Sequence, residues 1–259
     1  MANINRVLAH WPAGMVATQD WLQARGVTAD QARKWLRSGW LVRVGHGAYA
    51  RAGDRLGWEG AVAGLQATGA DEQPAYWPAG LTALEMFVGA HFLSFGRFQL
   101  EMWGLPGKSL PRWFAEYDWG ASASYHNYRL FEGESGEHLV THTPAGRDYS
   151  LLVSAPEWAV LEWLYSLPKT QLFSERVMVT FEGLGTLRPL RVQQALEACR
   201  SVQVKRVFLY LAREFDHTWY HRLDPGLIDL GRGKRQLYPD GKLDREFLIT
   251  VPERLNNGI

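Results

Sequence analysis

The first forty residues place apolar side chains at helical spacing, interrupted by residues that start and stop helices. Helices are predicted over 3–11, 19–25 and 29–38. Thr18 and Thr28 are typical N-caps for the second and third of these helices. A glycine, which tolerates the left-handed backbone that ends many helices, follows each of the two.

Strand composition replaces the helical pattern at residue 40. The run "WLVRV" is followed by the turn residues Gly45-His46-Gly47, and "AYAR" then returns as the partner strand. Three helices and a hairpin within about fifty residues predict a winged helix-turn-helix.

The predicted third helix separates into two faces at about 100° per residue. Its core-facing side chains are Ala32, Trp35 and Leu36. The opposite face carries Asp30, Lys34 and Arg37, flanked by Gln31 and Arg33. A solvated charged face is the plain structural interpretation. The net positive charge, the place in the helix-turn-helix and the following hairpin favour a face that binds DNA.

The rest of the chain alternates helical and strand patterns. Helices are predicted over 58–66, 81–88, 174–184, 189–200 and 204–215, and from the capping box "SAPE" at 154–157. Strands are predicted over 98–103, 128–131, 139–141, 235–238 and 247–251, the last two joined by the turn "PDGK". The predicted fold class is α+β, with a winged helix-turn-helix at 1–52 and a larger mixed α/β domain at 56–259. A sub-boundary near residue 150 stays open.

Composition is that of a folded globular protein. Of 259 residues 46% are hydrophobic and 13% aromatic, and the 12 Trp are expected mainly in the core. The start of the chain lacks the apolar block of a signal peptide, and no run approaches the ~20 apolar residues of a membrane span. A cytoplasmic protein is therefore expected. The single cysteine, Cys199, lies on an apolar helix face and is expected to be a buried thiol.

Charge is distributed unevenly along the chain. Residues 1–51 hold seven Lys and Arg against two acids, a net +5, whereas the remainder holds 21 against 25, a net −4. A small basic module attached to a mildly acidic body indicates a polyanionic partner. The predicted partner is double-stranded DNA. Its candidate contacts are Thr28, Asp30, Gln31, Arg33, Lys34, Arg37, Arg43, His46 and Arg51. For His46, a mere turn residue is an equally good interpretation.

Two other groups of residues predict a function less clearly. His217 and His221 have the i, i+4 spacing of a zinc pair, but a third ligand is not defined. The glycine-rich segment 231–235, "GRGKR", matches neither standard phosphate-binding motif. Two interpretations of this segment stay open. It is either a loop before the last hairpin or a second nucleic-acid contact through Arg232, Lys234 and Arg235. No catalytic motif, metal site or cofactor is predicted.

The sequence resembles the AbiEi family, antitoxins and transcriptional regulators of type IV toxin–antitoxin and abortive-infection systems. The resemblance rests on "ARKWLRSGWLVRVGHGAYAR", "GLTALEMFVGAHFL", "VKRVFLYLAREFDHTW" and "DLGRGKRQLYPDGKLDREFLITVP", and it is weakest over about residues 105–150. It implies a winged helix that binds operator repeats and represses its own operon. It also implies a C-terminal domain that neutralises a nucleotidyltransferase-like toxin, without implying direct contact between the two proteins. The DNA-facing positions that it implies include Lys34, Arg37 and Gly45-His46-Gly47.

The leading hypothesis is a non-enzymatic DNA-binding repressor of the antitoxin type. One alternative is a metal-dependent nuclease whose basic module delivers DNA to the larger domain. Others are a solitary regulator without a toxin and an interaction module whose acidic body binds a protein.

Overall fold

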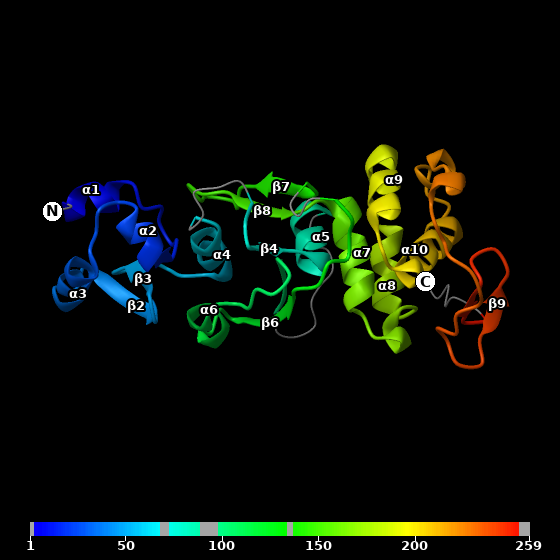
Figure 1. The fold of residues 1–259 in the computed structure, drawn as a ribbon, viewed down its shortest axis with the longest axis horizontal. Coiled ribbons are helices and arrows are strands. Elements are labelled where there is room, and N and C mark those ends of the chain that lie inside the picture. The colour runs from blue at the N-terminus through cyan, green and yellow to red at the C-terminus, as the bar shows by residue number, and fades with distance from the viewer. Residues whose placement is uncertain (1–2, 68–72, 89–97, 134–136, 254–259) are drawn as a thin grey trace. The chain divides into compact units, whose positions relative to one another are not determined.

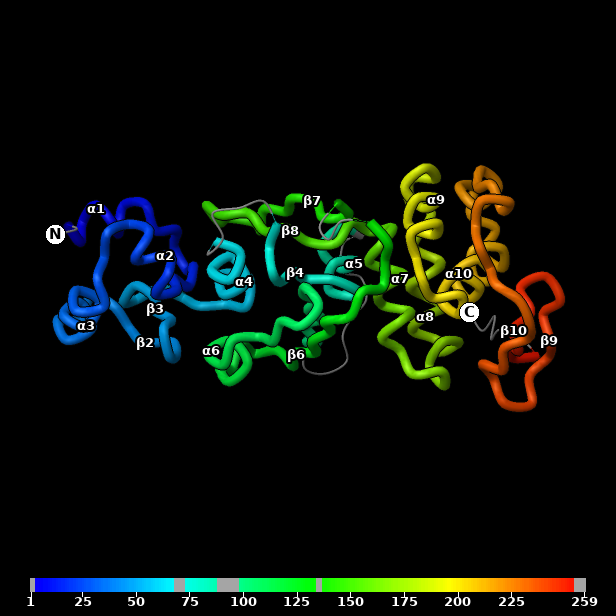
Figure 2. Tube along the Cα trace, in the orientation of Figure 1, coloured from blue at the N-terminus to red at the C-terminus, as the bar shows by residue number. Residues whose placement is uncertain are grey.

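The chain divides into two compact units in this computed structural model, whose helices and strands are labelled in Figure 1. The structure describes residues 3–67, 73–88, 98–133 and 137–253. Unit 1 comprises 1–78, 94–128 and 135–154, and unit 2 comprises 79–93, 129–134 and 155–259. The colour along the tube in Figure 2 lets the reader follow the chain from its N-terminus to its C-terminus.

The N-terminal module has the order helix, strand, helix, helix, strand, strand. Its elements are α1 (Ile4–Ala9), β1 (Ala17–Thr18), α2 (Gln19–Gln23), α3 (Ala29–Arg37), β2 (Leu41–Gly45) and β3 (Ala48–Arg51). The three strands form one antiparallel sheet in the order β1-β3-β2. The three helices and the hairpin are confirmed. Strand β1 was not predicted, because two residues carry no recognisable periodicity.

Side-chain caps determine where α2 and α3 begin. Thr18 Oγ1 accepts a hydrogen bond from Trp21 N at 3.2 Å. Thr28 Oγ1 likewise accepts from Gln31 N at 3.2 Å, and Gln31 Oε1 accepts from Thr28 N at 3.0 Å. This reciprocal capping box satisfies two backbone donors that would otherwise lack partners at the helix start.

The rest of unit 1 places two small sheets next to helix α4. Its elements are α4 (Trp58–Gln66), β4 (Tyr76–Pro78), β5 (Phe98–Gly104), α6 (Arg112–Glu116), β6 (Ala121–His126), β7 (Leu139–His142) and β8 (Leu151–Ser154). One sheet has the order β4-β5-β6, with β5 and β6 parallel, and the other pairs β7 with β8. The Gln66 side chain joins the sheets: its amide donates to Tyr76 O at 3.0 Å and Leu152 O at 2.8 Å, and it accepts from Leu152 N at 2.8 Å.

Helix α4 approaches the N-terminal module backbone to backbone. Val16 N donates to Gly60 O at 3.0 Å. A Cβ on Gly60 would lie 1.9 Å from Gly14 O, and one on Gly64 would lie 2.0 Å from Val16 O. Only glycine fits at these two positions, which bring α4 against the module. A domain boundary between residues 52 and 56 stays a prediction.

Unit 2 is mainly helical. Its helices are α5 (Gly80–Val88), α7 (Pro156–Ser166), α8 (Glu175–Glu182), α9 (Pro189–Ala198) and α10 (Val202–Glu214), with 3-10 turns η1 (Lys169–Gln171), η2 (Tyr220–Arg222) and η3 (Pro225–Leu227) and strands β9 (Lys242–Asp244) and β10 (Ile249–Val251). Helix α7 is buried along most of its length, and the fully buried Glu162 accepts a hydrogen bond from Gly80 N at the start of α5 (3.2 Å). Across the described ranges, none of the helices combines the length and the apolar character that crossing a bilayer requires.

The predicted capping box at 154–157 is wrong. Helix α7 begins at Pro156 after the N-cap Ala155, which offers no side-chain acceptor, and Ser154 instead ends β8. The Glu157 carboxylate pairs with Arg188, at 2.8 Å from its Nε, so it does not reach back to the helix start. Proline in the first turn remains the correct part of the prediction, because its fixed φ suits that position.

Two strand predictions are also wrong. In 128–131 only Phe131 forms a bridge, with Cys199, so this segment is not a strand. The terminal hairpin pairs β9 with β10, whereas 235–238 contributes only an isolated bridge from Arg235 to Ile249. The turn residues at 239–242 therefore lead into the hairpin and do not close it.

Candidate nucleic-acid interface

Helix α3 has one face in the core and one in solvent. Ala32 is fully buried, and Trp35 and Leu36 are half-buried. Lys34 and Arg37 are exposed on the other side. The wheel therefore separated the two faces correctly.

The single acid of α3 is already paired. Arg33 Nη2 lies 2.7 Å from Asp30 Oδ1, with both side chains more than half exposed. Such a pair contributes at most about 1 kcal/mol, but it neutralises one cation of the face. Within the described residues neither Lys34 nor Arg37 forms an ion pair, so these two side chains carry the net charge of the face. Thr28 and Gln31, which were also candidates, bond to each other in the capping box.

The wing is the hairpin of β2 and β3, residues 41–51, and a hydrogen bond joins its tip to the start of α2. Gly47 has a φ of +70°, and its carbonyl oxygen accepts a hydrogen bond from Gln19 N at 2.7 Å. Arg43 on β2 and His46 at the tip are exposed. The tip backbone is therefore fixed while both side chains are free to contact a ligand.

Packing holds the end of β2 against helix α6. A Cβ on Gly45 would lie 2.6 Å from Trp113 Cβ, and Trp113 itself is 7% exposed. Glycine at this position allows the wing strand and α6 to touch.

Arg51 stabilises the base of the wing. Its Nε and Nη2 donate to the two oxygens of Asp54 at 3.0 and 3.1 Å, and Asp54 Oδ2 also accepts from Gly14 N at 2.7 Å. Both side chains of the pair are largely buried. This bidentate pair ties the hairpin to the segment before α2, so Arg51 differs from the exposed candidates.

Sequence reasoning overlooked Arg25, which lies between α2 and α3. Its guanidinium carbon lies 3.7 Å from the centre of the Trp21 ring, and Nη1 donates to Trp21 O at 3.2 Å. Trp21 is buried and in turn contacts the Trp11 ring. The available signal was an arginine four residues after a tryptophan in the helix predicted over 19–25.

A second group of exposed cations lies in unit 2. Residues 231–235 expose Arg232, Lys234 and Arg235. Helix α10 supports this segment through the side chain of Arg206, which is 1% exposed and donates to the carbonyl oxygens of Leu230 at 2.8 Å and Gly233 at 2.7 Å.

The two histidines of the i, i+4 pair do not converge. Helix α10 ends at Glu214, before either of them. Buried His217 contacts Phe181 O through Nε2 at 2.7 Å, while exposed His221 contacts Asp216 at 2.6 Å. Among the described residues, no group of three or more His, Cys, Asp and Glu side chains could hold a metal ion.

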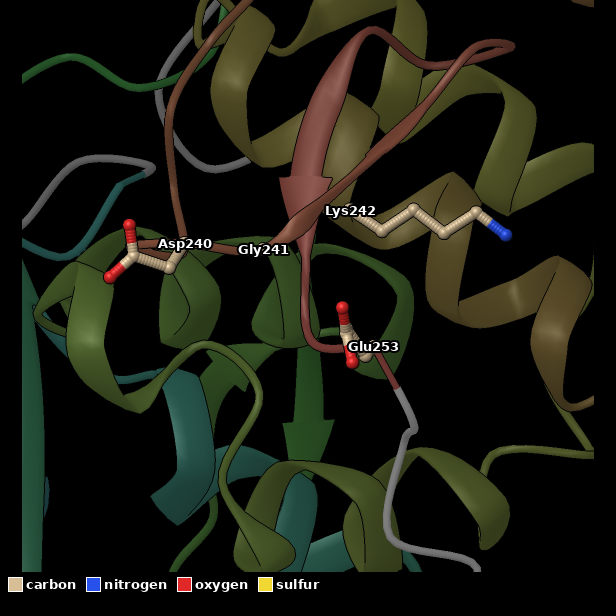
Figure 3. A pocket seen from close by; sticks show the side chains of 4 residues that line it. All are labelled: Asp240, Gly241, Lys242 and Glu253. Atoms are coloured by element: carbon tan, nitrogen blue, oxygen red, sulfur yellow. The ribbon is translucent and has the colours of Figure 1, made fainter.

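Two further features offer little chemistry. Burial raises the pKa of the Cys199 thiol to about 11, so at neutral pH it stays protonated and poorly nucleophilic. A pocket is lined by Asp240, Gly241, Lys242 and Glu253, but the side chains of Asp240 and Lys242 extend in opposite directions (Figure 3).

Both the sequence and the fold of the chain are similar to known proteins. Residues 1–95 match the family described as "Transcriptional regulator, AbiEi antitoxin N-terminal domain", and residues 97–252 match "Transcriptional regulator, AbiEi antitoxin, Type IV TA system". The fold is similar to that of the RV2827C protein from Mycobacterium tuberculosis, with a TM-score of 0.57 and 16% identity over 91% of this chain and 85% of that chain. No curated protein matches the sequence.

Proposed function

Because the chain belongs to the AbiEi family of type IV antitoxin transcriptional regulators, we propose that it represses its own operon by binding operator repeats through α3 and the wing. The observation that carries this proposal is the exposed cationic face of α3, where Lys34 and Arg37 have no acidic partner among the described residues.

The proposed contacts fall into two groups, those to base edges and those to the phosphate backbone of the DNA. A helix fits the major groove, where Lys34 and Arg37 could donate to guanine O6 and N7. Arg43 and Arg25, both exposed, are proposed to neutralise flanking phosphates, and His46 at the wing tip to contact the neighbouring groove. Thr28, Gln31 and Arg51 are proposed to act indirectly, because their hydrogen bonds hold α3 and the wing in place.

The antitoxin role is proposed to need no enzymatic step of this chain. Its functional partner would be a nucleotidyltransferase-like toxin, and repression of a shared operon limits the toxin without direct contact. Plasmid DNA incubated with the protein and Mg²⁺ or Mn²⁺ should remain intact. Metal-dependent cleavage that follows the protein through purification would favour the nuclease alternative.

A gel-shift assay on the promoter upstream of the gene tests DNA binding. The double variant Lys34→Ala/Arg37→Ala should weaken operator binding by at least about tenfold, since each lost base contact costs about 1–3 kcal/mol. Lys169→Ala/Arg222→Ala removes the same charge from exposed positions of unit 2 and serves as the control. Equal affinity of the two double variants would contradict the assignment of α3.

A further inference from the structure

The segment 231–235 concentrates positive charge in an otherwise acidic part of the chain. We call it the basic loop. It holds Arg232, Lys234 and Arg235 within four residues and contains no acid, whereas the chain beyond residue 51 has a net charge of −4. All three side chains are exposed, and none of them forms an ion pair or a side-chain hydrogen bond among the described residues.

The basic loop has a fixed backbone because a buried guanidinium holds it. Arg206 Nε donates to Leu230 O at 2.8 Å, and Nη1 donates to Gly233 O at 2.7 Å and, more weakly, to Leu248 O at 3.4 Å. A buried charge without a carboxylate is costly unless such charge-assisted hydrogen bonds compensate it. Burial, and then the positive charge of Arg235, lower the pKa of Arg206.

Local backbone contacts anchor both ends of the basic loop. At its start, Gly231 N donates to the Asp229 carboxylate at 2.8 Å, and a Cβ on Gly231 would meet Val202 at 3.1 Å. At its end, Arg235 N donates to Leu248 O at 2.9 Å and Arg235 O accepts from Thr250 N at 3.1 Å. Gly231 and Gly233 have φ values of +59° and +80°, which side chains other than glycine's rarely adopt. The three cations therefore project from a preorganised support.

From this arrangement we infer that the basic loop is a second nucleic-acid-binding site, which holds phosphodiester groups independently of α3. Two arginines and a lysine on a fixed backbone suit successive phosphates, since guanidinium forks bind phosphate oxygens in pairs. The loop contains no apolar side chain that could form the buried centre of a protein interface. DNA and RNA share the phosphodiester chemistry. The inference goes beyond operator recognition and does not depend on it.

The test uses the full chain with Lys34→Ala/Arg37→Ala as background, so that the α3 surface does not dominate binding. Into this background are introduced either Arg232→Ala/Lys234→Ala/Arg235→Ala or, as a control of equal charge, Lys169→Ala/Arg222→Ala/Arg245→Ala. The control positions are exposed and lie in the same unit. Fluorescence anisotropy measures binding of a short single-stranded RNA, the matching single-stranded DNA and a duplex without operator sequence, over a series of salt concentrations.

The basic-loop variant should bind at least about tenfold more weakly than the control, and the slope of log K against log salt should fall by about 2 to 3, as expected for three lost phosphate contacts. A loss confined to RNA or to DNA would support the site and identify its ligand. The inference is overturned if the background variant binds no nucleic acid, or if the basic-loop and control variants bind alike. Operator binding by the parent protein and the α3 variant tests the proposed function separately.

Discussion

At the residue scale, the arginines differ in what their guanidinium groups contact. Arg33 pairs with Asp30 on the helix surface, and Arg51 pairs with Asp54 beneath the wing. Arg37 is exposed and forms no ion pair among the described residues. From the sequence alone, all three arginines are equivalent candidates for DNA contacts, because partners such as Asp54 come close to them only when the chain folds.

The Glu157–Arg188 pair should make the protein sensitive to acid. Burial alone would raise the pKa of the Glu157 carboxyl, but hydrogen bonds from the Arg188 side chain and from backbone N–H groups outweigh it and lower the pKa. In an unfolded chain the pKa of a Glu side chain is about 4.3. The stabilisation of the fold by ionised Glu157 is therefore fully present above that pH and is lost as the pH falls through the lower pKa of the folded state. Arg188→Met is therefore expected to raise the pH at the midpoint of acid unfolding, followed by circular dichroism.

Arg200→Met provides the matched control for this measurement. Arg200 lies 3.7 Å from Glu132, with both side chains about half exposed or more, so the loss of this pair should change the midpoint little. If Arg188→Met and Arg200→Met unfold at the same pH, the Glu157–Arg188 pair does not stabilise the fold in the way described.

At the element scale, helices with clear periodicity and recognisable ends could be predicted. The cap residues Thr18 and Thr28 located α2 and α3 within a residue or two, and α4 was predicted with its correct bounds. Strand pairing could not be predicted as well. Strand β1 is too short to show a pattern, and β9 is paired by contacts with β10 that no local residue signals.

Gly64 provides a test of how tightly α4 packs on the N-terminal module. Gly64→Ala places a methyl group where Val16 O lies only 2.0 Å away, so the helix or the segment just before β1 must move. Overpacking of this kind typically costs about 1–3 kcal/mol of the free energy of unfolding. Gly57→Ala, which meets nothing within 4 Å at the start of the same helix, is the control. Because Gly57 is the N-cap of α4, where alanine is less favourable than glycine, its variant should lose a little stability. Urea denaturation should show a clearly lower midpoint for Gly64→Ala than for Gly57→Ala, and equal midpoints in the two variants would contradict the close approach.

At the scale of the whole molecule, the net charges of the two parts of the sequence indicated one candidate binding surface and missed another. The net +5 of residues 1–51 is the reason why the module that contains α3 is proposed to bind DNA. The net −4 of the remainder conceals the basic loop, because a sum over many residues cannot reveal three exposed cations within four positions. The support from buried Arg206 was also invisible, since it joins α10 to carbonyl groups more than twenty residues further along the chain.

The division into two units could not be predicted either. Each unit is assembled from three separate stretches of chain, because α5 packs with α7 in unit 2 while most of the residues between these two helices belong to unit 1. Sequence patterns describe neighbours along the chain, so they favour continuous domains. The two family matches identify a transcriptional regulator, and we propose that α3 of the N-terminal module supplies its DNA-binding face.

The most direct test of that role compares the dissociation constants for the operator and for a duplex of scrambled sequence at one salt concentration. A specific regulator typically prefers its site by about 10³-fold or more. If Lys34 and Arg37 contact base edges, substitution of both by alanine should reduce this preference by at least about tenfold, with a smaller change in binding to the scrambled duplex. An unchanged preference, with both duplexes bound equally more weakly, would show that α3 supplies only charge and that recognition lies elsewhere.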